Sequence, residues 1–107
     1  MNTTFTEQKA VVTGATRGIG RAITEALLAQ GATVIGIYSG DEKTAQEFAA
    51  TCPVPERLRL HKVDVSDYQA VEDFFQKVEE AFDTIDILIN NAGIRRDAAL
   101  ALMRRSG

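Results

Sequence analysis

Three glycines lie close together near the start of the chain, in the stretch AVVTGATRGIGRAI, at Gly14, Gly18 and Gly20. They stand between a short apolar run and a helical pattern. Where a strand turns directly into a helix, the first helical N–H groups have no partner. Together with the helix dipole, these groups form a site for an anion such as a pyrophosphate. Glycine is needed there because side chains would block the phosphate. The stretch predicts a phosphate-binding turn, and the alternative is a purely structural strand–helix turn.

Other reactive side chains are isolated in the sequence. His61 has no arrangement of carboxylate, serine or cysteine around it, and we expect it to be a strand residue that faces outward. The lone Cys52 excludes an intrachain disulfide and suits a reducing cytosol. A buried structural thiol is favoured over a reactive one, because no cationic residue lies near Cys52 in sequence. No residue spacing is typical of a metal site.

Length and composition describe one small globular domain. The chain has 107 residues, of which 45% are hydrophobic and 25% are charged. Its formal net charge of −3 gives no electrostatic reason to expect nucleic acid or an anionic membrane as a partner. The N-terminal MNTTFTEQK lacks the apolar core of a signal peptide, and no apolar run approaches the roughly 20 residues of a membrane helix. We therefore expect a cytoplasmic protein.

Apolar runs and helical patterns alternate along the chain. Short apolar or β-branched runs predict strands at residues 9–13, 33–38, 58–65 and 85–89. A first helix is predicted from an apolar stripe of Ile19, Ile23, Ala26 and Leu27, and Gly31 can close it in the left-handed conformation.

Two or three further helices follow from the same patterns. Residues 42–50 favour helix by propensity, and Pro53 and Pro55 end it. Ser66 is the expected N-cap of the third helix, which has the firmest apolar stripe of the chain, at Val71, Phe74, Phe75, Val78 and Phe82. Residues 98–103 could begin another helix.

The order of these elements predicts an α/β fold. Strands and helices that alternate in this way form a parallel sheet with right-handed crossovers and helices on both faces. The prediction is one half of a doubly wound (Rossmann) dinucleotide-binding fold with strand order 3-2-1-4. Residues 1–107 would form a single truncated domain of this kind.

Three motifs together resemble the short-chain dehydrogenase/reductase family. They are T-G-x-x-x-G-x-G from Thr13 to Gly20, Asp64-Val65 after the third strand, and Asn90-Asn91-Ala92-Gly93 after the fourth. They occur in the family's order and spacing and span nearly the whole chain, which is therefore similar to the family's N-terminal half. Within the family, the stretches TGATRGIGRAI and DILINNAGIRRDAAL look most like 3-oxoacyl-acyl-carrier-protein reductases and acetoacetyl-CoA reductases.

The resemblance implies a role for each motif in binding a cofactor. The glycine turn, comprising Gly14, Ala15, Thr16, Arg17, Gly18, Ile19 and Gly20, would surround the pyrophosphate and the adenosine ribose. Asp64, with the Val65 backbone, would receive the adenine amino group; the alternative for Asp64 is a turn acid before Ser66. The segment Asn90-Asn91-Ala92-Gly93 would brace the sheet beside the nicotinamide ribose, with Asn91 lining the cofactor. The alternative for the two asparagines is ordinary turn chemistry at a strand end.

The end of the second strand favours NADP over NAD as the dinucleotide. An enzyme that prefers NAD usually has an acid there, about 20 residues beyond the glycines, to hold the ribose 2′-OH. This chain has Tyr38 and Ser39 at that place, and Arg17 could supply the cation that a 2′-phosphate needs. The acids Asp41 and Glu42 lie just beyond and would oppose a 2′-phosphate, but the residues at the strand end still favour NADP. The alternative for Arg17 is a solvated loop arginine.

The resemblance also implies chemistry for which this chain lacks the residues. The family transfers hydride from the nicotinamide to a carbonyl, using a serine, a tyrosine and a lysine, with a further asparagine in a proton relay. In the family pattern all four lie downstream of Met103. Tyr38 and Tyr68 are the only tyrosines, and neither has a lysine at the family's spacing. No catalytic residue is therefore assigned, and Arg104-Arg105-Ser106-Gly107 departs from the family's continuation.

Three readings of the chain stay open. It could be the cofactor-binding half of an oxidoreductase, a catalytically silent nucleotide-binding or interaction module, or a truncated product that does not fold alone. The fourth strand expects a fifth beside it, so its backbone groups and the side chains Ile85, Ile87, Leu88 and Ile89 are expected to meet water. An unpaired apolar edge invites pairing with another chain. We therefore expect self-association through it.

Overall fold

The computed structural model describes residues 5–16, 18–82 and 85–91. Its strands are β1 (Lys9–Thr13), β2 (Thr33–Tyr38), β3 (Leu58–Lys62) and β4 (Ile87–Ile89). Its helices are α1 (Gly18–Ala29), α2 (Glu42–Thr51), a short 3-10 helix η1 (Pro55–Arg57) and α3 (Tyr68–Phe82). The helix expected at residues 98–103 lies outside the described residues.

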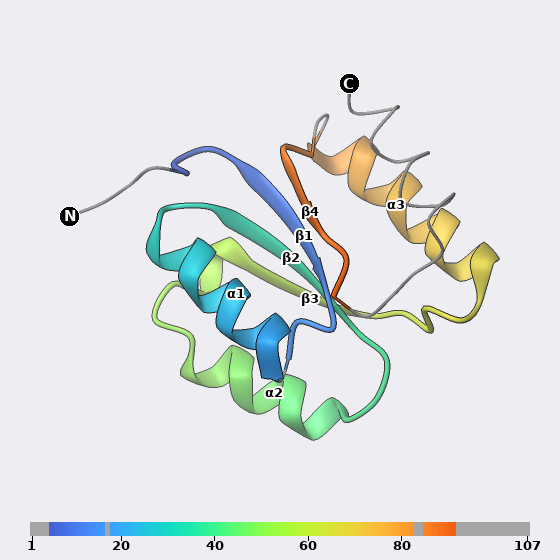
Figure 1. Cartoon of the computed structure of the whole chain (residues 1–107), viewed down its shortest axis with the longest axis horizontal. Helices are drawn as coiled ribbons and strands as arrows, with labels where there is room; N and C mark the ends of the chain where they lie inside the picture. Colours follow the sequence, from blue (N-terminus) through green and yellow to red (C-terminus); the bar gives the residue numbers. More distant parts are fainter. Residues whose placement is uncertain (1–4, 17, 83–84, 92–107) are drawn as a thin grey trace.

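The four strands form one parallel sheet in the order β3-β2-β1-β4, with α1 and α2 on one face and α3 on the other (Figure 1). In its register, Val11 of β1 lies opposite Ile35 of β2 and Leu88 of β4. This arrangement confirms the predicted α/β fold and its strand order. No described helix is long and apolar enough to cross a membrane.

Two apolar layers lie on the two faces of the sheet. Alternate side chains of a strand point to opposite faces. Val11 and Ile35 therefore pack against Val71 and Phe75 of α3, whereas the alternate strand residues pack with α1 and α2. That second layer contains Ala10, Val12, Val34, Leu27, Leu28 and Phe48. Burial on both faces explains why β1 and β2 are continuous apolar runs rather than alternating ones.

The C-terminal end of α1 is closed by Gly31, as predicted. Gly31 has φ of 98°, in the left-handed region. Its N–H donates to the Leu28 carbonyl oxygen, and the N–H of Ala32 donates to that of Leu27, both at 3.1 Å. These two bonds form a Schellman motif, which satisfies carbonyl groups that the helix itself leaves unpaired.

The buried face of α1 differs from the predicted stripe. Ile19 is 72% exposed and Ala26 is also exposed, so the stripe is wrong at these two positions. The buried residues of α1 are Gly20, Thr24, Leu27 and Leu28. Gly20 and Thr24 are the small residues of this face. The Thr24 hydroxyl has its hydrogen-bond partner within the helix, because it donates to the Gly20 carbonyl oxygen at 2.8 Å.

The N-terminal end of α3 is capped by Asp67, so the prediction that Ser66 is the N-cap is wrong. Oδ1 of Asp67 accepts a hydrogen bond from the backbone N–H of Ala70 at 3.2 Å. The Ser66 hydroxyl instead donates to Oδ1 of Asp64 at 2.6 Å. Both residue types are common N-caps, and Ser66 is already engaged in the preceding turn. The apolar stripe of α3 is confirmed, with Val71, Phe74, Phe75 and Val78 buried.

The two outer strands are shorter than predicted. β3 ends at Lys62 instead of residue 65, because the chain turns at Asp64, whose carbonyl oxygen accepts from the N–H of Asp67. β4 begins at Ile87 instead of residue 85. Ile85 is only 4% exposed and belongs to the layer under α3, so the expectation that it meets water is wrong. Ile87, Leu88 and Ile89 are half-buried.

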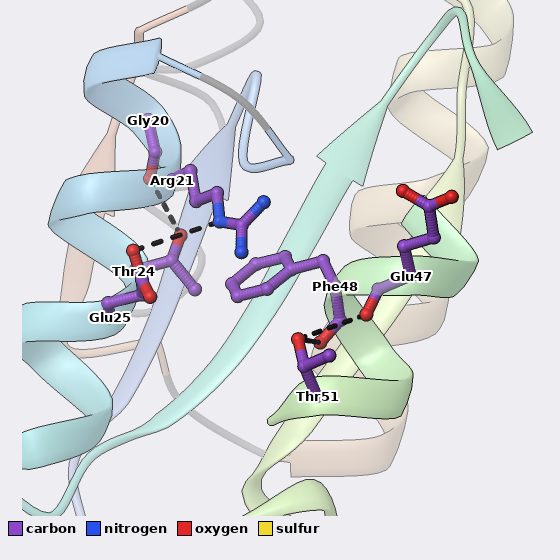
Figure 2. A network of polar contacts seen from close by, with 7 residues as sticks. All are labelled: Gly20, Arg21, Thr24, Glu25, Glu47, Phe48 and Thr51. Atoms are coloured by element: carbon purple, nitrogen blue, oxygen red, sulfur yellow. Dashed lines mark hydrogen bonds and ion pairs between the residues drawn. The ribbon is translucent and has the colours of Figure 1, made fainter. Parts of the chain in front are cut away.

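One side-chain contact connects α1 to α2 (Figure 2). The guanidinium of Arg21 lies over the ring of Phe48, 4.6 Å from its centroid. The Nε atom of Arg21 is also 3.8 Å from a carboxylate oxygen of Glu25, one turn along α1. Phe48 is buried, so Arg21 of α1 covers an apolar side chain of α2.

Candidate dinucleotide-binding site

A cavity of about 280 Å³ lies where β1, β2 and β4 end. Each of these strands is followed by residues that line it. The lining residues are Gly14, Thr16, Tyr38, Ser39, Gly40, Asp41 and Asn91. In open α/β sheets, ligands bind outside the carboxyl ends of the strands. Four of the predicted site residues, Gly14, Thr16, Ser39 and Asn91, therefore come together at one cavity.

The three glycines of the turn have three different surroundings. Gly14 and Gly18 have φ of 64° and 61°, a conformation that side chains with a Cβ rarely adopt. Space around Gly18 is open, with no atom within 4 Å of the place a Cβ would take. A Cβ on Gly20 would overlap the carbonyl oxygen of Gly14 and lie 2.7 Å from Nδ2 of Asn91. Gly20 thus allows α1 to approach the end of β1, whereas Gly18 leaves backbone open at the start of the helix.

The remaining turn residues divide between packing and exposure. Ala15 is fully buried, and its N–H donates to the Ile37 carbonyl oxygen at 3.0 Å. It packs over Gly36 of β2, where an added Cβ would lie 2.7 Å from Cβ of Ala15. Thr16 is nearly buried and lines the cavity, whereas Ile19 projects from the first turn of α1 into solvent. The glycine turn is therefore anchored on β2 through Ala15. The first turn of α1, which follows it, exposes Ile19 to solvent.

The ends of β1 and β4 are connected by side-chain hydrogen bonds. The Thr13 hydroxyl lies 3.4 Å from both the Ile89 carbonyl oxygen and Oδ1 of Asn90. Nδ2 of Asn91 donates to the Gly14 carbonyl oxygen, also at 3.4 Å. These long bonds hold the asparagine segment against the glycine turn.

Asp64 and Val65 lie apart from the lining of this cavity. Asp64 instead borders a second cavity of about 300 Å³, shared with Lys62 and with Asp73 and Lys77 of α3. Oδ1 of Asp64 accepts from the hydroxyl and the backbone N–H of Ser66, at 2.6 and 3.0 Å. These hydrogen bonds, that of the hydroxyl foremost, hold the pKa of Asp64 below its ordinary value of 3.8. Asp64 is the acid of a turn before Ser66; that it also receives an adenine amino group stays a prediction.

Arg17, Ala92 and Gly93 complete the predicted set and lie outside the described residues. No group of three potential metal ligands occurs in the part of the chain that the structure describes. Cys52 is buried at the C-cap of α2, as predicted.

His61 is exposed on β3, as predicted, with one added contact. Its ring meets that of Phe74 edge-on, with the ring centroids 5.3 Å apart. Partial burial lowers the pKa of His61 from 6.5, and the positive charges of Arg59 and Lys77 lower it further. The surroundings of His61 therefore favour the neutral imidazole.

Tyr38, Gly40 and Asp41 also line the cavity but are not among the predicted site residues. Asp41 is the N-cap of α2: its Oδ1 accepts from the N–H groups of Lys43 and Thr44. The signal for it is a capping residue directly before a helical pattern. Two helices thus begin beside the cavity. The positive end of the α1 dipole favours an anionic ligand there, whereas the Asp41 carboxylate already caps α2.

Comparison with known proteins identifies the family of the chain. The sequence matches the short chain dehydrogenase family over residues 8–106. It is 46% identical over 89 residues to an acetoacetyl-CoA reductase of Rhizobium meliloti, covering 83% of this chain and 35% of that protein. It is 41% identical over 100 residues to a 3-oxoacyl-[acyl-carrier-protein] reductase of Escherichia coli, covering 94% of this chain and 40% of that protein.

Solved structures agree. A metagenomic short-chain oxidoreductase in complex with NADP matches with a TM-score of 0.70 and 36% identity, covering 84% of this chain and 41% of that one. The chain thus spans well under half the length of these relatives. The motifs, the sheet order and the sequence match agree: the chain belongs to the short chain dehydrogenase family.

Proposed function

We propose that this chain is the NADP-binding half of a short chain dehydrogenase that reduces a 3-ketoacyl thioester by hydride transfer. The observation that carries the proposal is the glycine turn beside the cavity. Gly14 and Gly18 adopt left-handed conformations, and Gly20 lets α1 begin against the end of β1. Backbone N–H groups at the start of α1 would hold the pyrophosphate. The substrate class is carried over from the names of the relatives.

NADP is proposed in preference to NAD. A related structure was solved with NADP. In this chain, Ser39 stands at the end of β2, beside the cavity, where an NAD-preferring enzyme usually has an acid. A hydroxyl donates to a phosphate oxygen without repelling it. When bound, the nicotinamide supplies the hydride; the residues described here bind and orient the dinucleotide.

Residues for proton transfer are not assigned in this chain. Four positions beyond Tyr38 and Tyr68 stand Glu42 and Glu72, where the family's motif needs a lysine. Without the tyrosine–lysine pair, the sequence lacks the family's acid for protonating the alkoxide that forms as hydride arrives. We therefore propose that these 107 residues bind the cofactor and reduce no carbonyl substrate by themselves.

The proposal is tested by a fluorescence titration and an activity assay on the purified chain. NADPH should bind with higher affinity than NADH, and acetoacetyl-CoA should cause no oxidation of NADPH above the blank. A folded chain that binds neither dinucleotide would refute the binding function. Oxidation of NADPH that is lost when a residue of the chain is substituted would refute the proposal that these residues reduce no carbonyl substrate by themselves.

A second candidate, of another class, is an interaction module. Within the described residues, β4 is an edge strand that pairs with β1, and its three residues are half-buried isoleucine and leucine. The opposite edge, β3, carries Arg59, His61 and Lys62 as exposed residues. Charged residues protect an edge from pairing, and β4 has none. We propose that the chain self-associates through β4.

A further inference from the structure

Asp41 lies beside the candidate site, and both oxygens of its carboxylate accept hydrogen bonds from α2. Oδ1 accepts from the backbone N–H of Lys43 at 3.0 Å and from that of Thr44 at 3.3 Å. Oδ2 accepts from the hydroxyl of Thr44 at 2.7 Å, the shortest of the three bonds. Thr44 therefore supplies the hydroxyl bond to Oδ2 and one of the backbone bonds to Oδ1.

The position of Asp41 would otherwise suit a different role. It lines the cavity together with Ser39 and Gly40, two residues beyond the strand-end position at which an acid binds the ribose 2′-OH of NAD. A carboxylate that binds this hydroxyl needs an oxygen turned toward the ribose, and the same oxygen would repel a 2′-phosphate. In this chain the Thr44 hydroxyl holds Oδ2 toward α2, and the positive end of the helix dipole offsets the charge.

Glu42, the second acid of this loop, also has a partner. One of its carboxylate oxygens is 3.7 Å from Nζ of Lys62 on β3. Both side chains are more than half exposed, so the pair contributes little to stability, but it orients Glu42 toward β3. Lys62 borders the second cavity, not the candidate cofactor site. The two acids that would oppose a phosphate are thus both engaged elsewhere.

We propose that Thr44 is a positioning residue that sets the cofactor preference of this chain. By holding Asp41 as the cap of α2, it keeps a carboxylate at the ribose-binding loop from binding the 2′-OH and lets the loop accept a 2′-phosphate. The inference rests on the proposed function, because it concerns the choice between two dinucleotides at the same cavity. Thr44 itself does not line the cavity, and it acts through the side chain of Asp41.

The test measures the dissociation constants of NADPH and NADH for the full chain and its variants. Thr44→Val removes the hydroxyl and keeps the shape of the side chain, so the preference for NADPH over NADH should fall about fivefold. Thr44→Ser keeps the hydroxyl and should retain the preference. In the double variant with Asp41→Asn the negative charge is gone, so the preference should return toward that of the unsubstituted chain.

Thr51→Val is the matched control. Thr51 is the last residue of the same helix, at the end opposite to Asp41, and its hydroxyl donates to backbone oxygens of Glu47 and Phe48 (Figure 2). Its removal should leave the cofactor preference unchanged. A positioning role of Thr44 is overturned if Thr44→Val, folded by circular dichroism, keeps the preference within about twofold, or if Thr51→Val lowers it equally. An unsubstituted chain that binds neither cofactor would refute the proposed function and this inference with it; an unchanged preference in Thr44→Val refutes the inference alone.

Discussion

Gly20 and Gly40 both lie at the carboxyl end of the sheet, but their surroundings differ. A Cβ on Gly20 would overlap the Gly14 carbonyl oxygen and crowd Asn91, whereas a Cβ on Gly40 would meet no atom within 4 Å. Gly40 also lies outside the left-handed region that Gly14 and Gly18 occupy. The requirement for glycine at position 20 is therefore one of packing between α1 and β1.

This difference predicts unequal effects of alanine at the two positions. Gly20→Ala must displace backbone, so the free energy of unfolding should fall by about 1–3 kcal/mol. Gly40→Ala should change it by no more than about 0.5 kcal/mol. Urea denaturation followed by circular dichroism measures both values. Equal stabilities of the two variants would contradict the packing role of Gly20.

The lowered pKa of His61 leads us to expect that the stability of the fold depends on pH. Its pKa is lowered in the folded chain, by partial burial first and by Arg59 and Lys77 second. The unfolded chain therefore takes up the proton first as the pH falls below 6.5, and stability is lost until the pH reaches the lowered pKa of the folded state. Above 6.5 this contribution is fully present. His61→Gln should remove this part of the difference in unfolding free energy between pH 7.5 and 5; a variant with the same difference as the unsubstituted chain would contradict it.

At the scale of elements, a cation–π contact connects α1 to α2. Arg21 covers the ring of Phe48 and lies near Glu25 (Figure 2). Arg21→Met should lower the free energy of unfolding by about 0.5–1 kcal/mol, because a cation over an aromatic ring is lost. Glu25→Gln should have a smaller effect, because the ion pair is exposed. Thermal melts of both variants test this order, and a larger loss for Glu25→Gln would contradict it.

The central elements follow from the sequence, and their ends do not. β1 and β2 are buried on both faces, which their continuous apolar runs indicate. Periodicity also finds the α3 stripe, but it does not show that Ile19 faces solvent while Gly20 packs inward, since that depends on how closely α1 approaches β1. The choice of Asp67 over Ser66 as cap depends on a bond from Ser66 to Asp64 that spacing does not reveal.

The candidate site is also predictable only in part, because some of its residues come together through contacts between distant parts of the chain. Gly14 and Thr16 belong to one local turn, and Asn91 reaches them because β4 pairs with β1. Gly40 and Asp41 line the cavity only because the loop after β2 folds back into the cap of α2, which is a three-dimensional consequence of the Asp41 and Thr44 hydrogen bonds.

At the scale of the whole molecule, the two described edges of the sheet differ in character. β3 carries exposed charged side chains, and β4 is apolar. If β4 mediates self-association, Ile87→Lys or Ile89→Lys should lower the average mass measured by sedimentation equilibrium. Arg59→Glu, on the opposite edge, is the control and should leave that mass unchanged. Both isoleucines pack partly against the layer under α1 and α2, so circular dichroism must show that the variants fold. A folded, unsubstituted chain that stays monomeric at high concentration would contradict the proposal.

Binding of the dinucleotide at the glycine turn is tested most directly by an NMR titration of the ¹⁵N-labelled chain with NADPH, which reports where the dinucleotide binds. We expect amide shift changes at Gly18 and at residues that line the cavity where β1, β2 and β4 end, namely Gly14, Thr16, Ser39, Gly40 and Asn91. Amides of α3 that border the second cavity, those of Asp73 and Lys77, should not move. Shift changes centred on the second cavity, or none at saturating NADPH in a folded chain, would contradict the claim that the glycine turn and the cavity beside it hold the cofactor.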